Sequence, residues 1–228
     1  MKKILMCGIL AAASMTLPAQ EKGYLTGSFE TTDHVYVADE GNKFTPDDDR
    51  FGSNNYIKLD YYNGNFSAGL QLESYMPALI GYPDELNKYA LSNMYVNWTD
   101  DAFQITAGTF YDQFGSGLLF RSWEDRTLGL NNAIVGARAT YNFKNYASVK
   151  VLWGIPRLGT GNNDGQFFGF GLTKVNVAGA DLSVSLSDIF SMDKTSLSVE
   201  GSVLNKHEAV SDLYAERGYR PNMFGWSG

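Results

Sequence analysis

Apolar and polar residues alternate with a period of two along most of the chain. In the run FSAGLQLES, apolar side chains fall on Phe66, Ala68, Leu70 and Leu72, and the positions between them are small or polar. Because successive side chains of a β-strand point to opposite faces, this period predicts strands with one apolar and one polar face. The same pattern predicts no long helix. Ten strands are expected, at residues 23–30, 55–62, 66–75, 89–98, 103–110, 134–143, 146–154, 166–176, 181–188 and 196–204.

The connections between the expected strands alternate in length. Asn63-Gly64 is the clearest short joint, because Asn-Gly suits a hairpin turn whose two central residues need positive φ. Further tight joints are expected at Asp100-Asp101, Lys144-Asn145 and Ala178-Gly179. Long connections separate the short ones, at 31–54, 76–88, 111–133 and 155–165, with a shorter one at 189–195.

This alternation places the short turns at one end of the sheet and the long connections at the other. Transmembrane β-barrels have this arrangement, with short periplasmic turns and longer extracellular loops. A soluble sandwich with Greek-key crossings would place some long connections at the turn end. Aromatic residues flank the turns and would form the periplasmic-side girdle of a barrel, although packing in a soluble core is the alternative for each pair. The pairs are Tyr62 and Phe66, Trp98 and Phe103, and Phe143 and Tyr146.

The predicted fold class is all-β, a transmembrane antiparallel up-and-down β-barrel with about ten strands present. Single-chain bacterial barrels close with an even number of strands. The tail past Lys206 has Pro221 and no clean alternation, and it reads as the beginning of an eleventh strand. From this tail we expect an incomplete barrel, truncated at its C-terminus. An unclosed sheet would leave edge hydrogen-bonding groups in lipid.

The start of the chain has the pattern of a secretory signal peptide. Two lysines precede an apolar run, and small residues follow it. The run of about 14 residues is shorter than the roughly 20 of a membrane-spanning helix. We therefore expect residues 1–19 to be a signal peptide and residues 20–228 to be the barrel domain. Cys7 is the only cysteine and lies in the signal, so the mature chain has no disulfide, thiolate metal site or cysteine nucleophile.

The mature chain is acidic. Without Lys2 and Lys3, 16 basic residues face 25 acidic ones, a formal charge of −9. Nucleic-acid-binding proteins present a basic face, so this balance argues against nucleic acid as a partner.

One connection concentrates charge. The stretch FYDQFGSGLLFRSWEDR, residues 110–126, has glycines that permit sharp backbone turns and an apolar piece at 118–120 that could be buried. Such a connection could fold back into a barrel lumen, where its charges pair with one another or with wall residues. Opposed charges would then form a constriction that selects solutes; the alternative is a neutral network that braces the barrel. The candidates are Asp112, Arg121, Glu124, Asp125 and Arg126 in the connection, and Lys58, Asp60, Glu73, Arg138 and Lys150 on the wall.

Other chemical signals are weak. His34 lies near Asp33 and Asp39 and could act as a base, but no nucleophile motif accompanies it. The acidic runs at 47–49 and 162–165 do not follow the spaced calcium-loop pattern. We therefore expect no catalytic residues, no metal and no cofactor.

Three runs carry a family resemblance. DRFGSNNYIKLDYYNGNFSAGLQLE, TAGTFYDQFGSGLLFRSWEDRTLGLNNAIVGARATYNF and VKVLWGIPRLG resemble the N-terminal half of an uncharacterised family of outer-membrane, porin-like β-barrel proteins of Bacteroidota. The most specific element is FGSGLLFRSWEDR followed by LGLNNAI. The resemblance covers residues 23 to about 204 and implies an outer-membrane location and truncation. It implies no catalytic residues.

Three functions remain open. The first is a porin-like barrel in outer-membrane lipid that passes small solutes or serves as the membrane part of an envelope assembly. The second is a surface-binding or adhesion scaffold with a blocked lumen and functional extracellular loops. Inward-facing small residues such as Gly69 and Gly136 would favour an open lumen. The third, a hydrolase, requires a nucleophile near His34 or His207.

Overall fold

The computed structural model describes most of the chain beyond its first residues. The expected signal peptide, residues 1–19, lies outside the described residues, as do the acidic runs at 47–49 and 162–165. The described residues are 23–39, 41, 50–82, 89–157, 172–192, 194–208, 216–218 and 220–228.

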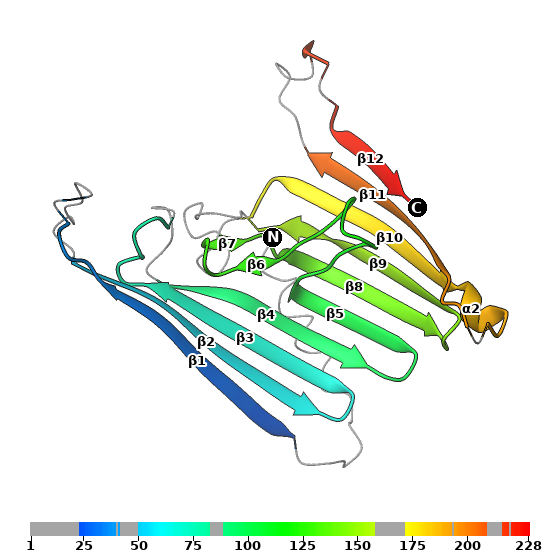
Figure 1. The fold of residues 1–228 in the computed structure, drawn as a ribbon, viewed down its shortest axis with the longest axis horizontal. Coiled ribbons are helices and arrows are strands. Elements are labelled where there is room, and N and C mark those ends of the chain that lie inside the picture. The colour runs from blue at the N-terminus through cyan, green and yellow to red at the C-terminus, as the bar shows by residue number, and fades with distance from the viewer. Residues whose placement is uncertain are drawn as a thin grey trace, which may run out of the picture.

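Ten strands form one antiparallel sheet in which each strand pairs with its neighbours along the chain (Figure 1). The all-β, up-and-down architecture expected from the sequence is therefore confirmed. In sheet order the strands are β1 (Tyr24–Val35), β2 (Phe51–Asn63), β3 (Phe66–Tyr75), β4 (Tyr89–Thr99), β5 (Phe103–Phe110), β8 (Ile134–Phe143), β9 (Ala147–Pro156), β10 (Val175–Ser185), β11 (Ser198–Glu208) and β12 (Asn222–Ser227).

Two smaller elements complete the described part. A short hairpin of β6 (Glu124–Asp125) and β7 (Leu130–Asn131) lies within the connection between β5 and β8. One turn of helix, α2 (Leu186–Ile189), follows β10. Among the described residues, no helix is long and apolar enough to cross a membrane.

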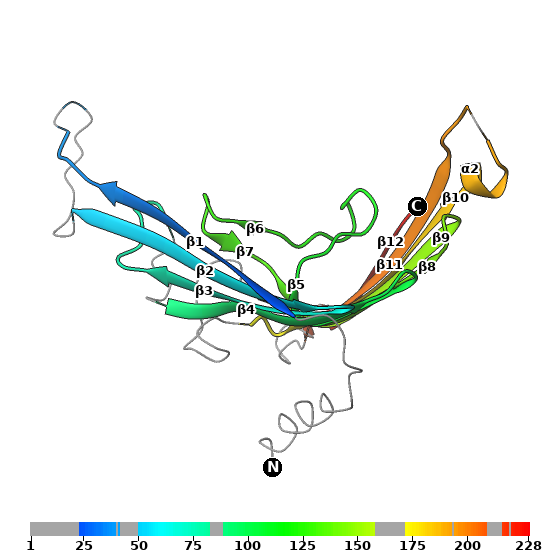
Figure 2. The ribbon, with the colours of Figure 1, turned by 90° about the horizontal axis from the view of Figure 1, so that it is seen from below.

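The sheet is curved and open (Figure 2). Among the described residues β1 pairs only with β2, and β12 pairs only with β11, so the two strands stand at opposite edges of the sheet. The β5–β8 connection lies on the concave side (Figure 2). The structure thus shows an antiparallel meander that is not closed into a barrel.

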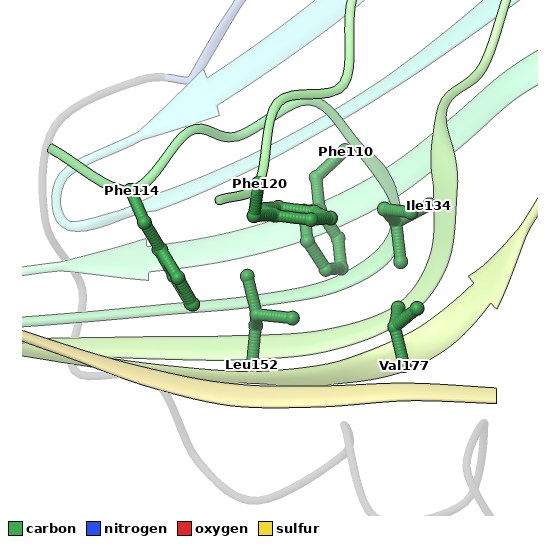
Figure 3. Close-up of a cluster of buried hydrophobic side chains, with 6 residues drawn as sticks. All are labelled: Phe110, Phe114, Phe120, Ile134, Leu152 and Val177. Carbon is green, nitrogen blue, oxygen red and sulfur yellow. The ribbon is translucent and has the colours of Figure 1, made fainter. Parts of the chain in front are cut away.

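The two faces of the sheet differ in polarity. On the concave face, the connection and the strands form a buried cluster of Phe110, Phe114, Phe120, Ile134, Leu152 and Val177 (Figure 3). The rest of that face carries mainly polar side chains. The alternate positions face the convex side, and most are apolar and exposed. They include Leu25, Phe29, Ile57, Leu59, Leu72, Met94, Val96, Trp98, Ile105, Val151, Trp153, Leu182, Val199, Val203, Phe224 and Trp226.

The tight turns lie together at one end of the sheet (Figure 1). The expected hairpin at Asn63-Gly64 is present, displaced by one residue: Asn63 pairs with Phe66, and Gly64, with φ of 55°, is the first residue of the two-residue turn. At the next turn, Asp100 Oδ1 accepts hydrogen bonds from the Ala102 and Phe103 amides at 2.9 and 2.7 Å. The Asp100 carboxylate thus gives a hydrogen-bond acceptor to two turn amides that would otherwise lack one.

The predicted turn at Ala178-Gly179 is wrong. Both residues lie in the middle of β10, where Gly179 pairs with Leu152 on one side and Leu204 on the other. A Cβ on Gly179 would lie 2.6 Å from Phe114 Cε2 and 2.8 Å from the Val203 carbonyl oxygen. The glycine is therefore required by close packing and not by a turn.

The strands expected at 166–176 and 181–188 are corrected accordingly. One strand, β10, covers 175–185, and α2 occupies the end of the second predicted range. Residues 166–171 lie outside the described part. The tenth strand of the sheet is instead β12, formed by the tail in which the sequence indicated the beginning of an eleventh strand. In β12, Gly225 faces the concave side, where a Cβ would collide with Leu119 of the β5–β8 connection.

Candidate functional site

The candidate site is the β5–β8 connection, residues 111–133, together with the concave face that it covers (Figure 2). The connection contacts strands near both edges of the sheet. On one side, Glu30 of β1 forms an ion pair with Arg126 of the connection. On the other side, a Cβ built on Gly225 of β12 would contact Leu119 of the connection. The connection therefore crosses the whole concave face.

Asp112 anchors the beginning of the connection. Its side chain is 4% exposed and forms ion pairs with Arg138 Nη1 at 3.0 Å and Lys150 Nζ at 2.6 Å. Arg138 also donates from Nε to Thr106 Oγ1 at 3.3 Å. Three of the candidate charges thus meet at one place, on β8, on β9 and at the beginning of the connection.

An apolar contact follows this anchor. The rings of Phe114 and Phe120 lie 5.2 Å apart and pack against Leu152 and other strand residues of the buried cluster (Figure 3). Phe120 is buried as the apolar piece at 118–120 suggested, whereas Leu118 is 87% exposed. Phe114, which the sequence reading did not single out, is only 1% exposed.

Arg126 anchors the end of the connection to the other half of the sheet. Its guanidinium contacts Glu30 Oε2 at 2.6 Å and Glu124 Oε2 at 3.2 Å, and it donates to Gln71 Oε1 at 3.0 Å. It also lies 4.3 Å from the centre of the Tyr56 ring. Burial alone would lower the pKa of Arg126, but the charges of Glu124 and Glu30 outweigh it and raise the pKa. Arg126 therefore stays charged in this setting.

Glu124 links Arg126 to further hydrogen bonds with Gln71 and Asn131. Its Oε1 accepts from Gln71 Nε2 at 3.2 Å and from Asn131 Nδ2 at 3.1 Å. Asn131 Nδ2 also donates to the Tyr111 hydroxyl at 2.8 Å. Burial, reinforced by the charge of Glu124, raises the pKa of Tyr111, so the phenol stays protonated.

Two candidates in the connection have local roles. Asp125 Oδ1 accepts from the Thr127 hydroxyl at 2.6 Å and from the Thr127 and Leu128 amides at 3.0 and 3.2 Å. These bonds lower the pKa of Asp125, the hydroxyl of Thr127 contributing most. Arg121 lies over the Trp123 ring at 5.3 Å. Neither side chain forms an ion pair within the described residues, so neither belongs to the charge network on the wall.

The remaining wall candidates pair separately. Glu73 forms a buried ion pair with Arg157, in which the two side chains are 3% and 4% exposed. Lys58 Nζ lies 3.2 Å from Asp60 Oδ2, and Asp60 Oδ1 accepts from the Tyr95 hydroxyl at 2.8 Å. The structure thus divides the candidate residues among several separate contacts and does not place them in one ring.

The sequence reading missed several residues of the site. Arg157 directly follows Pro156 at the end of β9, and Glu30, Gln71 and Tyr56 sit on strands whose alternation reveals only the face they occupy. A charged residue next to a strand end was the one available signal for Arg157. No sequence pattern marks its partner, because Glu73 is 84 residues away.

Small wall residues do not leave open space where they were expected to. Gly69 faces the concave side, but its ideal Cβ position is already occupied by Asp60 and the Tyr95 ring. Gly136 is required by the close approach of the Trp153 carbonyl and Gly154 on β9. Both glycines therefore serve packing.

The described residues include both histidines, His34 on β1 and His207 on β11. In the described part of the chain there is no group of three or more histidine, cysteine, aspartate or glutamate side chains that could hold a metal ion. His207 Nδ1 lies 2.8 Å from Asn222 Oδ1, and the His34 ring lies 6.1 Å from the Tyr36 ring, edge-on. Within the described residues neither histidine is hydrogen-bonded to a hydroxyl or a carboxylate.

The fold and site define a class of protein: an all-β chain with an antiparallel meander whose concave face is crossed by a charged connection. The whole chain, residues 1–228, matches the model of a family described as a family of unknown function (DUF6029), and the chain belongs to that family. Comparisons with curated proteins and with solved structures gave no match. The family's description assigns no activity, so the function must be argued from the geometry.

Proposed function

We propose that this chain is a porin-like protein of the outer membrane, in which the ten strands cross the bilayer and the β5–β8 connection narrows a polar lumen. The observation that carries the proposal is the segregation of side chains between the two faces of the sheet. Large apolar residues such as Leu59, Val151 and Trp153 are exposed on the convex face, while charged and amide side chains lie on the concave face.

The convex face matches lipid better than water. Soluble monomers rarely expose continuous apolar patches of more than a few hundred Å². Here the apolar face continues from β1 to β12, without a covering layer among the described residues. In a bilayer the same face would be in its preferred solvent, since barrel strands present alternate apolar residues to lipid.

An aromatic row near the turn end supports the same orientation. The Trp98 and Phe103 rings lie 6.3 Å apart, Phe103 and Tyr141 lie 6.4 Å apart, and Tyr141 and Phe143 lie 4.6 Å apart. All four face the convex side. Tyr62 instead stacks on Tyr24 at 5.1 Å on the other face. Aromatic girdles mark the interfaces of membrane barrels, so this row would lie at the periplasmic surface.

Membrane insertion requires the two edges of the sheet to be paired. In hydrocarbon each unpaired backbone group costs several kcal/mol, so lipid-exposed sheet edges do not occur. We therefore propose that the edges of β1 and β12 are paired in the membrane, with each other or with further strands. The proposed export signal at residues 1–19 would deliver the chain to the envelope.

The inward connection would give the lumen its selectivity. Charges of both signs lie on its two sides: Asp112 with Arg138 and Lys150, and Arg126 with Glu124 and Glu30. A narrow lumen with balanced charge would pass small hydrophilic solutes without strong preference for one sign. Solutes would be excluded chiefly by size.

Membrane fractionation and bilayer recording test the proposal. The protein extracted from outer membranes should run faster unboiled than boiled on a gel, as a folded barrel does. In planar bilayers the extracted protein should give discrete conductance steps that a boiled sample does not give. Recovery only in the periplasmic fraction, without a heat-dependent shift, would overturn the membrane assignment.

A surface-binding scaffold with a blocked lumen is the second candidate. It is favoured by the side chains that fill the concave side: the Tyr95 ring occupies the space at Gly69, and the Phe114 ring occupies the space at Gly179. A scaffold of this kind would insert and show the heat-dependent gel shift, but it would not conduct. The bilayer recording therefore separates the two candidates.

A further inference from the structure

A polar hollow lies on the concave face beside the buried apolar cluster, with which it shares Phe110. It has a volume of about 350 Å³, within the range of roughly 300–1,000 Å³ that is usual for small-molecule sites. Strands β3, β4, β5 and β8 and the start of the β5–β8 connection form its wall. The lining residues are Ser67, Asn93, Tyr95, Asn97, Gln104, Thr106, Thr109, Phe110, Tyr111 and Arg138.

Hydrogen bonds between neighbouring strands hold the floor of this hollow. Asn97 Nδ2 donates to Ser67 Oγ at 3.4 Å, and Asn97 Oδ1 accepts from Thr106 Oγ1 at 2.8 Å. Thr106 Oγ1 in turn accepts from Arg138 Nε at 3.3 Å. The floor is therefore fixed before any solute arrives, which lowers the entropic cost of binding.

Two amides in the hollow have unused hydrogen-bonding capacity. Asn93 Oδ1 is buried, and no described residue donates a hydrogen bond to it. The Gln104 side chain lines the hollow and has no hydrogen-bond partner among the described residues. A buried acceptor without a donor is costly, and a bound hydroxyl would satisfy it. Amides offer both a donor and an acceptor, which matches adjacent hydroxyls on one molecule.

The charge of the hollow favours a neutral solute. Of the described residues that line it, Arg138 alone is charged, and Asp112 lies 3.0 Å from that guanidinium. A carboxylate solute would compete with Asp112 for a cation that is already paired. The rings of Tyr95, Phe110 and Tyr111 add apolar surface beside the polar groups.

We propose that this hollow binds a neutral, polyhydroxylated solute, an oligosaccharide, on the inner wall. The site combines amide and hydroxyl groups, aromatic surface and no uncompensated charge, which together suit a sugar. The inference rests on the proposed function in one respect: a solute would reach the concave face through the lumen.

The test measures binding directly, independently of conductance. The full chain, extracted in detergent from membranes, is titrated calorimetrically with maltotriose, and with trigalacturonic acid as an acidic trisaccharide. Maltotriose should bind and the acidic sugar should bind at least tenfold more weakly. Asn93→Leu and, separately, Gln104→Leu should each weaken maltotriose binding at least tenfold, because each removes hydrogen-bonding groups from the hollow.

Asn142→Leu is the matched control, since Asn142 shares the concave side of β8 but does not line the hollow. It should leave binding unchanged, and every variant must show the heat-dependent gel shift before titration. Absence of maltotriose binding in the unaltered chain, tighter binding of the acidic sugar, or equal losses in the pocket and control variants would each overturn the inference. Conductance without binding would leave the porin proposal standing, and binding without conductance would leave the site standing.

Discussion

Lys150 on β9 places its Nζ atom 2.6 Å from Asp112 Oδ1, although the two residues are 38 positions apart in the chain. The contact fixes the start of the β5–β8 connection to the wall. Arg138 on β8 approaches the other oxygen of the same carboxylate at 3.0 Å. A single acidic side chain therefore holds two strands and the connection together.

Replacing Asp112 with asparagine should loosen this anchor. The amide keeps the size of the side chain but leaves two partly buried cations without their counter-charge. We expect the free energy of unfolding to fall by about 2 kcal/mol, less than the roughly 3–5 kcal/mol of a fully buried pair, because both cations retain some solvent contact. Urea unfolding followed by tryptophan fluorescence in lipid vesicles measures the change.

Asp101→Asn is the control for this variant, because Asp101 is exposed at a turn. Its effect should stay within about 0.5 kcal/mol. Equal stability of the Asp112 variant and the unaltered protein would show that the ion pairs do not hold the connection.

The pair of Glu73 and Arg157 should contribute more than any exposed pair. Both side chains are almost fully buried, so Glu73→Gln removes the negative charge that Glu73 places beside the buried Arg157 guanidinium. We expect a loss of about 3–5 kcal/mol. Glu208→Gln, which breaks an exposed pair with Lys206, should cost about 0–1 kcal/mol. The same urea titration compares them, and similar costs for the two variants would contradict the burial argument.

Because the convex face is proposed to contact lipid, an arginine introduced there should destabilise the protein more than an arginine on the concave face. Val151 lies near the middle of β9, is 46% exposed and faces the convex side. At the bilayer midplane an arginine there should cost about 2–4 kcal/mol of stability in vesicles. Ser183→Arg on the concave face of β10, opposite Glu200, should be tolerated. Equal tolerance at the two positions would argue against lipid contact.

Acid should open the turn that follows Asp125. The pKa of Asp125 is lower in the folded chain than its ordinary value of 3.8, because the carboxylate accepts bonds from Thr127 and Leu128. The stabilisation is therefore present above pH 3.8 and is lost as the pH falls through the lower folded pKa. Hydrogen exchange of the segment, corrected for intrinsic rates, should show protection at pH 5 that disappears in strong acid.

Asp125→Ala provides the reference for the acid experiment. The variant should lack this protection at pH 5 as well, because its side chain accepts no hydrogen bonds. Protection that persists in the variant would assign the order of the turn to other contacts, such as the β6–β7 pairing.

Strand positions were largely readable from the sequence. The predicted bounds of β3, β5 and β8 agree with the structure at both ends. A period of two is a local property of the chain, and it was clear where strands carry apolar residues on one face only. It failed at Gly179, because a glycine that a distant phenylalanine requires looks the same in sequence as a glycine in a turn.

The sequence by itself determined the strands, their two faces and the charged connection, since each follows from residues close together in the chain. The tertiary structure decided the rest: the curvature that makes the polar face concave, and the partners of the charges. Asp112 could have paired with any cation on that face. Register and curvature selected Arg138 and Lys150 and buried Arg157 against Glu73, because these contacts depend on strands that the chain brings together only on folding.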